Sequence, residues 1–316
     1  MLICHVNAAS LKGLDQEVAC FKALGAELRA VRCSTPDELE ANVKDAEILL
    51  FTATKFDDEV FDRLPNLRLL VRYGIGYDTV DIGAAKRHNV IVCNSPTYGC
   101  YDVAEHAFAL LQAANRKIAV YDRKMRGGNC GASAAYPCYR MAGKQMGFIG
   151  YGRIARNMAN FALGFGMKLA AYDPYADAAN ANPPAAAMSL EELLKTSDFV
   201  SINSVLNDQT RGMMNAERFA LMKPTAILVN TSRGGLIDED ALYEALVSKT
   251  IRAAGIDVWN EMPKTADNRF CQLDNIVMTP HAAWNTVEAA QALKEEVMQT
   301  VTRYIKGEEL PNRLWR

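Results

Sequence analysis

Three side chains with reactive chemistry each follow an apolar segment in the second half of the chain. Arg233 follows AILVN, Glu261 follows RAAGIDV, and His281 follows NIVM. Such apolar segments are typical of buried parallel strands, and parallel sheets bind ligands at the carboxyl ends of their strands. An arginine can grip a carboxylate through two hydrogen bonds, and a histidine can move a proton near neutral pH. These residues therefore predict a site for a small carboxylic acid, in which a carboxylate beside the histidine would orient it.

The chain contains four histidines, and their positions differ. His5 lies in an apolar segment, His88 precedes another, and His106 lies within a helical pattern. Each of these three is expected to be an ordinary structural residue. His281 alone follows a strand of the sheet that carries Arg233, which without its neighbours would be interpreted as a surface arginine.

A dinucleotide-binding pattern precedes these residues. The strand QMGFIG leads into GYGRIA (150–155), a helical pattern follows, and a second strand ends at Asp173. The pattern G-x-G-x-x-A alone is a weak signal, but the strand, helix and second strand are the context that it requires. The helix amino terminus would face the cofactor phosphates. The predicted cofactor-binding residues of this segment are Gly150, Gly152, Arg153, Ile154 and Asp173.

The physical roles of this segment favour NAD over NADP. Gly150 permits a tight turn, and Gly152 lets the backbone approach the pyrophosphate. Asp173, 23 residues after Gly150, can accept hydrogen bonds from the adenosine ribose. Pro174 and Tyr175 come next, so neither lysine nor arginine follows to hold a 2′-phosphate. A glycine turn with an incidental acid is the alternative interpretation.

Strand and helix patterns alternate along the whole chain, which predicts an α/β protein with two doubly wound parallel sheets. The strands from 145 to 280 fit one Rossmann sheet, and the segment before it forms a smaller α/β unit. Long helical patterns cover 101–126 and 286–307, with Asn285 as the expected N-cap of the second. The segment AANANPPAAA (178–187) is expected to be a surface loop. The predicted strands are 2–6, 47–53, 67–72, 89–94, 145–150, 167–173, 198–203, 226–230, 252–258 and 275–280.

The composition narrows the class of protein. The 316 residues suggest two domains, and 50% hydrophobic residues are enough for a sizeable core. The net charge of −2, with no long basic run, does not indicate a nucleic-acid partner. No window of 18 apolar residues indicates a membrane span, and the amino terminus does not resemble a signal peptide. The eight cysteines form no C-x-x-C pair, so we expect reduced thiols in a cytoplasmic protein.

Several longer segments together resemble the D-isomer-specific 2-hydroxyacid dehydrogenases. They are VRYGIGYDTVDIGAAKRHNVIVCNSP, DVAEHAFALL, MGFIGYGRIA, LMKPTAILVNTSRGGLIDEDAL and MTPHAAW, in the family's order. The resemblance implies an NAD-binding Rossmann domain (99–287) inserted into a flavodoxin-like substrate domain (1–98 plus 288–316). It also implies an active site in the cleft and a homodimer built through the NAD domains. The motif HAAW and the stretch VYDRKMR…YDPY look closest to the branch that includes the C-terminal-binding protein corepressors.

The resemblance assigns roles to individual residues. Arg233 matches the arginine that grips the substrate, and His281 matches the histidine that transfers the proton. The backbone of Gly74, Ile75 and Gly76 would meet the substrate carboxylate. Val205 stands where the family usually has proline. Further cofactor-lining positions would be Ser204, Val205, Thr231, Ser232, Asp257 and Ala283.

The candidate acid departs from the family pattern. The family reads D-V-F-x-x-E-P, with its glutamate five residues after the aspartate. That place is Met262 here, and Glu261 lies one residue early. Both sides align without a gap, so we expect a site that lacks this acid. In the alternative, the loop absorbs the offset and Glu261 becomes the catalytic acid.

The sequence thus predicts an NAD-dependent oxidoreductase that interconverts a small 2-hydroxy acid and its 2-oxo acid, without a metal. The rival hypothesis is an NAD(H)-sensing binding protein with weak or no turnover, which the corepressor resemblance and Met262 favour. A phosphoglycerate dehydrogenase is less favoured, because no regulatory domain is expected after residue 316. Lys55 and Arg72 could meet a phosphate but are expected to be surface charges.

Overall fold

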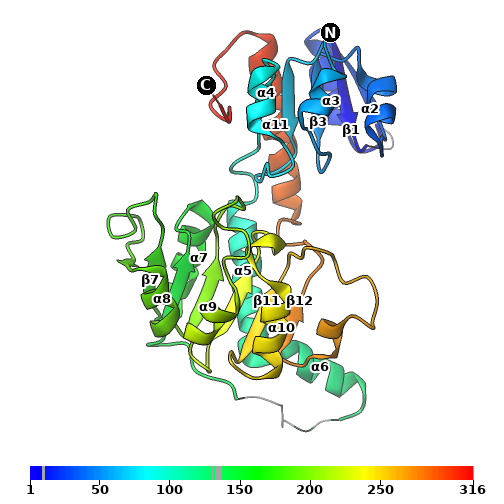
Figure 1. The fold of residues 1–316 in the computed structure, drawn as a ribbon. Helices are drawn as coiled ribbons and strands as arrows, with labels where there is room; N and C mark the ends of the chain where they lie inside the picture. The colour runs from blue at the N-terminus through cyan, green and yellow to red at the C-terminus, as the bar shows by residue number, and fades with distance from the viewer. Residues whose placement is uncertain (9–10, 130, 132–136, 316) are drawn as a thin grey trace. The chain divides into compact units, whose positions relative to one another are not determined.

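The computed structural model describes residues 1–8, 11–129, 131 and 137–315. The chain forms two compact units (Figure 1). One consists of Met1–Gly99 and Thr286–Arg316, and the other of Cys100–Asn285. The sequence placed these boundaries after residues 98 and 287. Each unit is built on its own parallel sheet, as the expected α/β class requires.

The first unit contains a five-stranded parallel sheet of order β2-β1-β3-β4-β5. This order is that of flavodoxin-like folds, in which ligands bind where the strand order reverses. Helices cover both faces, with α2, α3 and α4 on one and α1 and α11 on the other. The strands are β1 Leu2–Val6, β2 Glu27–Val31, β3 Ile48–Phe51, β4 Leu69–Arg72 and β5 Ile91–Cys93. The helices are α1 Asp15–Ala23, α2 Pro36–Val43, α3 Asp58–Asp62, α4 Ile82–Arg87 and α11 Val287–Ile305.

The second unit contains a seven-stranded parallel sheet of order β12-β11-β10-β9-β6-β7-β8. This is the Rossmann order with one strand added at the end, and it reverses between β6 and β9. The strands are β6 Gln145–Ile149, β7 Lys168–Tyr172, β8 Ala186–Ala187, β9 Phe199–Ile202, β10 Ile227–Asn230, β11 Ala253–Ile256 and β12 Ile276–Met278. The helices are α5 Cys100–Arg116, α6 Ile118–Arg126, α7 Arg153–Gly164, α8 Leu190–Thr196, α9 Ala216–Leu221 and α10 Glu239–Val247.

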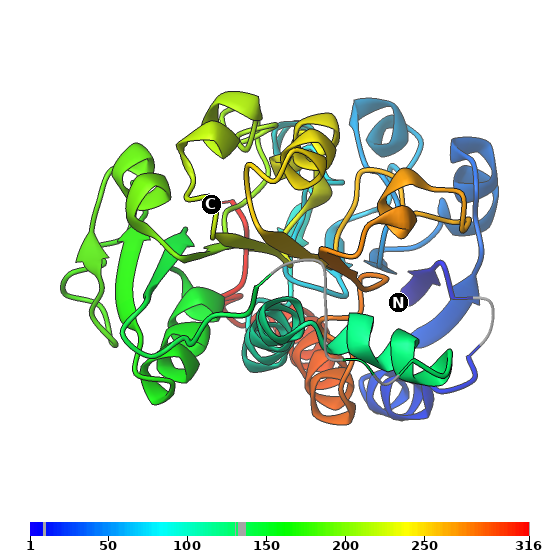
Figure 2. The ribbon, with the colours of Figure 1, turned by 90° about the horizontal axis from the view of Figure 1, so that it is seen from below.

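Helices cover both faces of the second sheet (Figure 2), and buried side chains pack between the helices and the strands. Residues of α5 and α7 form the core on one face, and residues of α8, α9 and α10 form it on the other. Strands buried on both faces read as continuous apolar runs, and this explains why the sequence shows them without alternation. Pairing with both neighbours holds the carboxyl ends of the central strands in fixed register.

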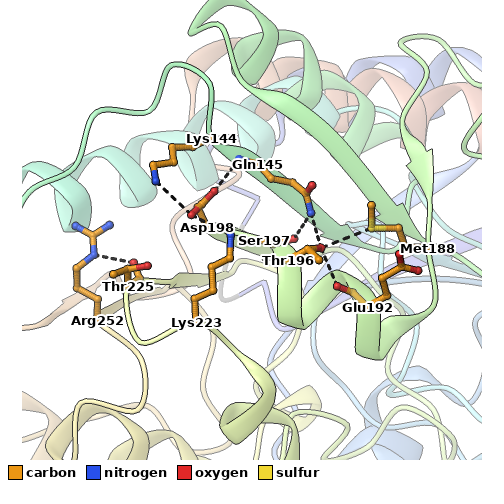
Figure 3. Close-up of polar contacts among 10 residues, drawn as sticks. All are labelled: Lys144, Gln145, Met188, Glu192, Thr196, Ser197, Asp198, Lys223, Thr225 and Arg252. Carbon is orange, nitrogen blue, oxygen red and sulfur yellow. Dashed lines mark hydrogen bonds and ion pairs between the residues drawn. The ribbon is translucent and has the colours of Figure 1, made fainter.

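Polar contacts hold the amino ends of the same strands together (Figure 3). Asp198, just before β9, accepts a hydrogen bond from the backbone N–H of Gln145 at 3.0 Å. Its carboxylate also lies 3.2 Å from Nζ of Lys223. Arg252, just before β11, donates to the carbonyl oxygen of Thr225 at 2.9 Å. These charged groups are therefore occupied in joining strands, and the reactive side chains lie at the opposite, carboxyl edge.

The long helix expected over 101–126 is two helices. Lys117 separates α5 from α6 and adopts a left-handed conformation, with φ at 59°. Just before it, buried Asn115 donates to the carbonyl oxygen of Tyr139 at 3.0 Å and accepts from Arg252 at 3.0 Å. These partners come from distant segments, so helical periodicity alone could not show the break.

Three smaller expectations were also wrong. The N-cap of α11 is Thr286, whose hydroxyl accepts from the N–H of Ala289 at 3.0 Å, and not Asn285. The segment 178–187 ends in the short strand β8, because Ala186 pairs with Ala170 at the sheet edge. The edge strand β2 was missed, since ELRAV is only partly buried.

The cysteines of the described residues are free thiols, and Cys130 lies outside those residues. Burial raises the pKa of Cys4 to about 11 and that of Cys93 to about 12, so both remain protonated and unreactive. Within the described ranges, no three His, Cys, Asp or Glu side chains gather as metal ligands would. None of the helices seen there has the length and apolar character needed to cross a bilayer.

Candidate active site

The glycine turn after β6 lies where the strand order of the second sheet reverses. The backbone angle φ of Gly150 is 88°, a value that residues other than glycine rarely adopt. A Cβ atom there would lie 2.7 Å from the carbonyl oxygen of Asn203, after β9. Gly152 is the exposed N-cap of α7. The turn therefore leaves the α7 amino terminus open to an anionic group such as a pyrophosphate.

Asp173 follows β7 and is fixed against this turn. Its Oδ2 accepts from the N–H of Tyr151 at 2.7 Å. Its Oδ1 accepts from the N–H groups of Tyr175 at 2.8 Å and Ala176 at 3.1 Å. No lysine or arginine of the described chain pairs with the Asp173 carboxylate. Each carboxylate oxygen has more than one lone pair, so Asp173 can still accept hydrogen bonds from a ribose.

Hydroxyl groups line the ends of β9 and β10. Ser204 donates to the carbonyl oxygen of Ile149 at 3.2 Å, and Ser232 donates to that of Ile202 at 2.8 Å. The hydroxyl of Thr231 is buried and has no partner among the described residues. A buried polar group without a partner is uncommon and indicates a place for a ligand or a water. This unpaired hydroxyl and the open glycine turn both fit a bound dinucleotide.

The turn that carries Arg233 is held by Asn230, the last residue of β10. The buried Asn230 side chain donates to the carbonyl oxygen of Arg233 at 2.8 Å and accepts from the N–H of Ser232 at 3.0 Å. The guanidinium donates to the carbonyl oxygen of Ser232 at 2.8 Å and is partly exposed. Asn230 was not among the predicted site residues, although asparagine is typical of such turns.

Gly234 lets the loop after β11 pack directly beside Arg233. A Cβ atom on Gly234 would lie 2.1 Å from the carbonyl carbon of Trp259. The loop is also tied to α10, because the N–H of Asn260 donates to Glu239 at 2.7 Å. The backbone that leads to Glu261 and Met262 is therefore fixed by its neighbours.

Within this loop the two candidate side chains differ in exposure. Glu261 is exposed, and its carboxylate makes no hydrogen bond or ion pair with any residue of the described segments. Met262, at the family's glutamate position, is partly buried. Neither residue therefore supplies a carboxylate that is held in place in this loop, because Glu261 has no partner among the described residues and Met262 has no carboxylate.

Asp257 organises the segment that contains His281. Its carboxylate is fully buried and accepts from the hydroxyl of Thr279 at 2.6 Å and from the N–H groups of Ala282 at 2.8 Å and Ala283 at 3.1 Å. Its carbonyl oxygen accepts from the N–H of His281 at 2.8 Å. One residue thus holds four points of a five-residue segment.

His281 itself adopts a left-handed backbone conformation, with φ at 56°. Histidine is enriched among the few residues other than glycine that adopt it, and such conformations persist where the surroundings fix them. The side chain is exposed at the carboxyl edge of the sheet. The segment is therefore shaped so that an imidazole projects from a rigid turn.

His106, expected to be an ordinary helical residue, lies against this segment. Its Nε2 is 3.0 Å from the hydroxyl oxygen of Thr279 and 3.7 Å from Oδ1 of Asp257. The two contacts connect residues separated by 173 and 151 positions in the chain. The sequence reasoning missed both His106 and Thr279, and no local pattern pairs them.

In the first unit, the loop after β4 presents backbone N–H groups. The carbonyl oxygen of Ile75 accepts from the side chain of Asn94 at 2.7 Å, and that of Gly74 accepts from the N–H of Ser95 at 3.0 Å. The N–H groups of Ile75 and Gly76 have no acceptor among the described residues. Because the carbonyl groups are held inward, these N–H groups can donate to an anion.

Asn94 is itself held by the carboxyl-terminal segment. Its carbonyl oxygen accepts from the side chain of Asn312 at 2.6 Å, and Asn312 also donates to the hydroxyl of Thr300 in α11. Lys55, a possible phosphate contact, instead pairs with Asp57 at 2.9 Å on the surface. The loop that presents the N–H groups of Ile75 and Gly76 is therefore held in place by these contacts.

Comparisons with known proteins agree with this geometry. Residues 108–283 match the family model described as "D-isomer specific 2-hydroxyacid dehydrogenase, NAD binding domain". The chain is 38% identical over 283 residues to glyoxylate reductase of Pyrococcus furiosus, covering 87% of this chain and 84% of that protein. It is 38% identical over 294 residues to D-3-phosphoglycerate dehydrogenase of Mycobacterium leprae, covering 92% of this chain and 55% of that protein.

Solved structures are similar over the whole chain. An acyclic imino acid reductase in complex with NADPH and D-Arg aligns with a TM-score of 0.89 at 30% identity, and both chains are covered completely. The chain spans about half the length of the first curated relatives that it matches. The family model covers more than half of this chain, and the glyoxylate reductase matches over most of both sequences. The chain therefore belongs to the D-isomer-specific 2-hydroxyacid dehydrogenase family.

Proposed function

We propose that the protein is an NAD-dependent oxidoreductase that reduces a small 2-oxo acid to its 2-hydroxy acid and catalyses the reverse reaction. The observation that carries this proposal is the rigid placement of Arg233 and His281 after β10 and β12, in the sheet that also holds the dinucleotide turn. A cation for a carboxylate and a group that can exchange a proton are the two protein functions that this chemistry needs.

The cofactor is held by residues at the carboxyl edge of the second sheet. Gly150 and Gly152 admit the pyrophosphate, and Asp173 accepts from the ribose hydroxyl groups. The 2′-phosphate of NADPH would lie beside the negatively charged Asp173 carboxylate, and no cation of the described chain is paired with that carboxylate. This arrangement favours NADH over NADPH. NADH supplies the hydride that C2 of the oxo acid receives. The remaining residues proposed to contact the cofactor are Arg153, Ile154, Ser204, Val205, Thr231, Ser232, Asp257 and Ala283.

The side chains of this protein bind the substrate and move the proton. Arg233 grips the substrate carboxylate. The family resemblance assigns the loop of Gly74, Ile75 and Gly76 to the same carboxylate, and the N–H groups of Ile75 and Gly76 are the ones without an acceptor among the described residues. His281 in its protonated form donates a proton to the ketone oxygen as C2 is reduced, which gives the hydroxyl group. In the oxidation direction, neutral His281 accepts the hydroxyl proton.

We propose that the site works without the carboxylate that the family pattern places beside this histidine. The exposed position of Glu261 and the absence of any partner for it among the described residues support this proposal. Met262 has no charge, so it does not stabilise a protonated imidazole. The second candidate function, an NAD(H)-sensing protein with little turnover, rests on the same observation and on the corepressor resemblance, which stays a prediction.

The test is a panel of small 2-oxo acids, each assayed with NADH and with NADPH. Glyoxylate, hydroxypyruvate, pyruvate and 2-oxoisocaproate cover small, polar and branched side chains. We expect NADH oxidation with at least one of them, at a higher kcat/KM than with NADPH. Tight NADH binding without turnover of any substrate would replace the proposal with the NAD-sensing function.

We further propose that the protein is a homodimer in the cytoplasm, joined through the unit Cys100–Asn285. Large apolar side chains are exposed on α5, α6 and α7, which is typical of an interface. They are Tyr101, Ile118, Met125 and Leu163, together with Phe165, which directly follows α7. The free thiols fit a reducing compartment.

Light scattering of the Leu163→Asp variant tests the dimer. We expect a charge at this position to weaken a dimer and give half the mass of the wild-type particle. Val287→Asp is the matched control, because Val287 is exposed in the other unit. Equal masses for all three proteins would remove Leu163 from the interface.

A further inference from the structure

His106 is the only group that can carry a positive charge within 4.0 Å of the Asp257 carboxylate, among the residues that the structure describes. Asp257 is fully buried, and the groups that donate hydrogen bonds to its carboxylate are uncharged: one hydroxyl and two backbone N–H groups. A buried carboxylate needs donors or an opposite charge to offset its desolvation. His106 lies on α5, which packs against β10, β11 and β12.

The hydrogen atoms of this cluster can be assigned from its donors and acceptors. The Thr279 hydroxyl has one hydrogen and lies 2.6 Å from Oδ1 of Asp257. An ionised carboxylate only accepts, so Thr279 donates to Asp257. The hydroxyl oxygen of Thr279 is then the acceptor for His106 at 3.0 Å. His106 must therefore carry a hydrogen on Nε2.

The same cluster fixes the backbone on both sides of His281. Thr279 lies two residues before it, and the N–H groups that bind Asp257 belong to the two residues after it. The left-handed conformation of His281 lies between these anchors. A change in the hydrogen bonding of Thr279 or Asp257 is thereby transmitted to the position of the His281 imidazole.

We propose that His106 is a positioning residue for the proton-transfer histidine. Its Nε2–H donates to Thr279, which leaves the Thr279 hydroxyl hydrogen directed at Asp257 and keeps the His281 turn in one conformation. This inference rests on the proposed function for its catalytic consequence, whereas its structural part concerns only the hydrogen bonds of the free protein.

Histidine-selective ¹⁵N NMR of the wild-type protein tests the hydrogen assignment directly. Four histidines give a spectrum that single substitutions can assign. We expect the His106 signals to show a hydrogen on Nε2. A neutral His106 with its hydrogen on Nδ1 would overturn the inference without any need for a variant.

Variants test the transmission to His281. In His106→Leu we expect the His281 signals to shift, kcat to fall by about 10-fold to 100-fold, and the affinity for NADH to stay unchanged. His106→Gln keeps an N–H donor near the same place, so we expect it to restore most of kcat. His88→Gln is the matched control, because His88 pairs with Asp58 at 3.3 Å in the other unit. It should leave kcat and the His281 signals unaltered.

A double variant distinguishes a role of His106 that acts through Thr279 from a general contribution of His106 to packing. If His106 acts through Thr279, combining His106→Leu with Thr279→Val should cost no more in kcat than the larger single effect. Additive losses, or a folded His106→Leu protein with unaltered His281 signals and kcat, would overturn the proposal. If wild-type protein reduces no 2-oxo acid, the proposed function fails, and the NMR experiments still decide the role of His106. If His106→Leu does not fold, Thr279→Val breaks the same link from its other end.

Discussion

Single residues at the carboxyl edge of the second sheet each have several hydrogen-bond partners. Asp257 holds the His281 segment, and Asp173 joins the glycine turn, through the N–H of Tyr151, to its own loop, through the N–H groups of Tyr175 and Ala176. The sequence motif predicts that Asp173 binds a ribose, but it gives no sign of this second, structural role. Substitutions at such residues therefore change the local backbone as well as the ligand contact.

Asp173→Asn tests the cofactor preference with a substitution that hardly changes the shape of the side chain. The amide keeps an oxygen acceptor but loses the charge, and a hydrogen bond to a charged group is worth about 1.5–3 kcal/mol. We expect kcat/KM with NADH to fall by about 10-fold to 100-fold and the preference over NADPH to narrow. Wild-type protein that uses NADPH as well as NADH would show that Asp173 does not select the cofactor.

Arg233→Ala tests the grip on the substrate carboxylate. Loss of a paired charged contact should cost about 2–5 kcal/mol in transition-state binding, with a raised KM and a lowered kcat. The affinity for NADH, measured by fluorescence titration, should change little. Arg126→Ala is the control, since Arg126 pairs with Asp122 on the surface at 2.8 Å. Normal kinetics in Arg233→Ala would remove this residue from the site.

Glu261→Gln and Met262→Glu decide which position matters for proton transfer. Reduction needs a protonated imidazole, and a carboxylate nearby stabilises that form. Met262→Glu should therefore move the alkaline limb of the reduction profile to higher pH and raise turnover near neutrality. Glu261→Gln should leave the limb where it is. A collapse of activity in Glu261→Gln, with the limb moved to lower pH, would instead make Glu261 the catalytic acid.

At the scale of elements, loops after strands depend on close backbone contacts. The sequence predicts most strands of both sheets because burial on two faces gives long apolar runs, as in β9 and β10. It does not predict the break at Lys117 or the edge strands β2 and β8, because partners elsewhere in the chain determine them. The close contact between Gly234 and Trp259 is likewise a feature that depends on a distant segment and that the sequence does not predict.

Gly234→Ala tests how the loop after β11 is held. The added Cβ would lie 2.1 Å from a backbone carbon, so the loop or the Arg233 turn must move. We expect the free energy of unfolding in urea to fall by about 1–3 kcal/mol, as for overpacked sites, and kcat/KM to fall with it. Gly164→Ala is the control, because its Cβ would meet nothing within 4 Å. It should not destabilise the protein.

At the scale of the whole molecule, an inserted Rossmann unit interrupts a smaller parallel-sheet unit. The family motifs and the strand alternation were enough to predict both units and the order of segments. The hydrogen bonds that join His106, Thr279 and Asp257 could not be predicted, since they connect α5 to the ends of β11 and β12. Specificity for the side chain of the proposed 2-oxo acid likewise depends on loop shapes that no local pattern encodes.

The most direct test of the proposed enzyme is the rate of NADH oxidation by 2-oxo acids in wild-type protein and in His281→Ala, with NADH affinity measured on the same samples. Loss of a general acid typically costs 10²–10⁴-fold, so we expect kcat to fall by roughly that factor while NADH binds equally well. Equal rates for the two proteins would contradict the proton-transfer role of His281. NADH binding without turnover in the wild-type protein would contradict the oxidoreductase itself.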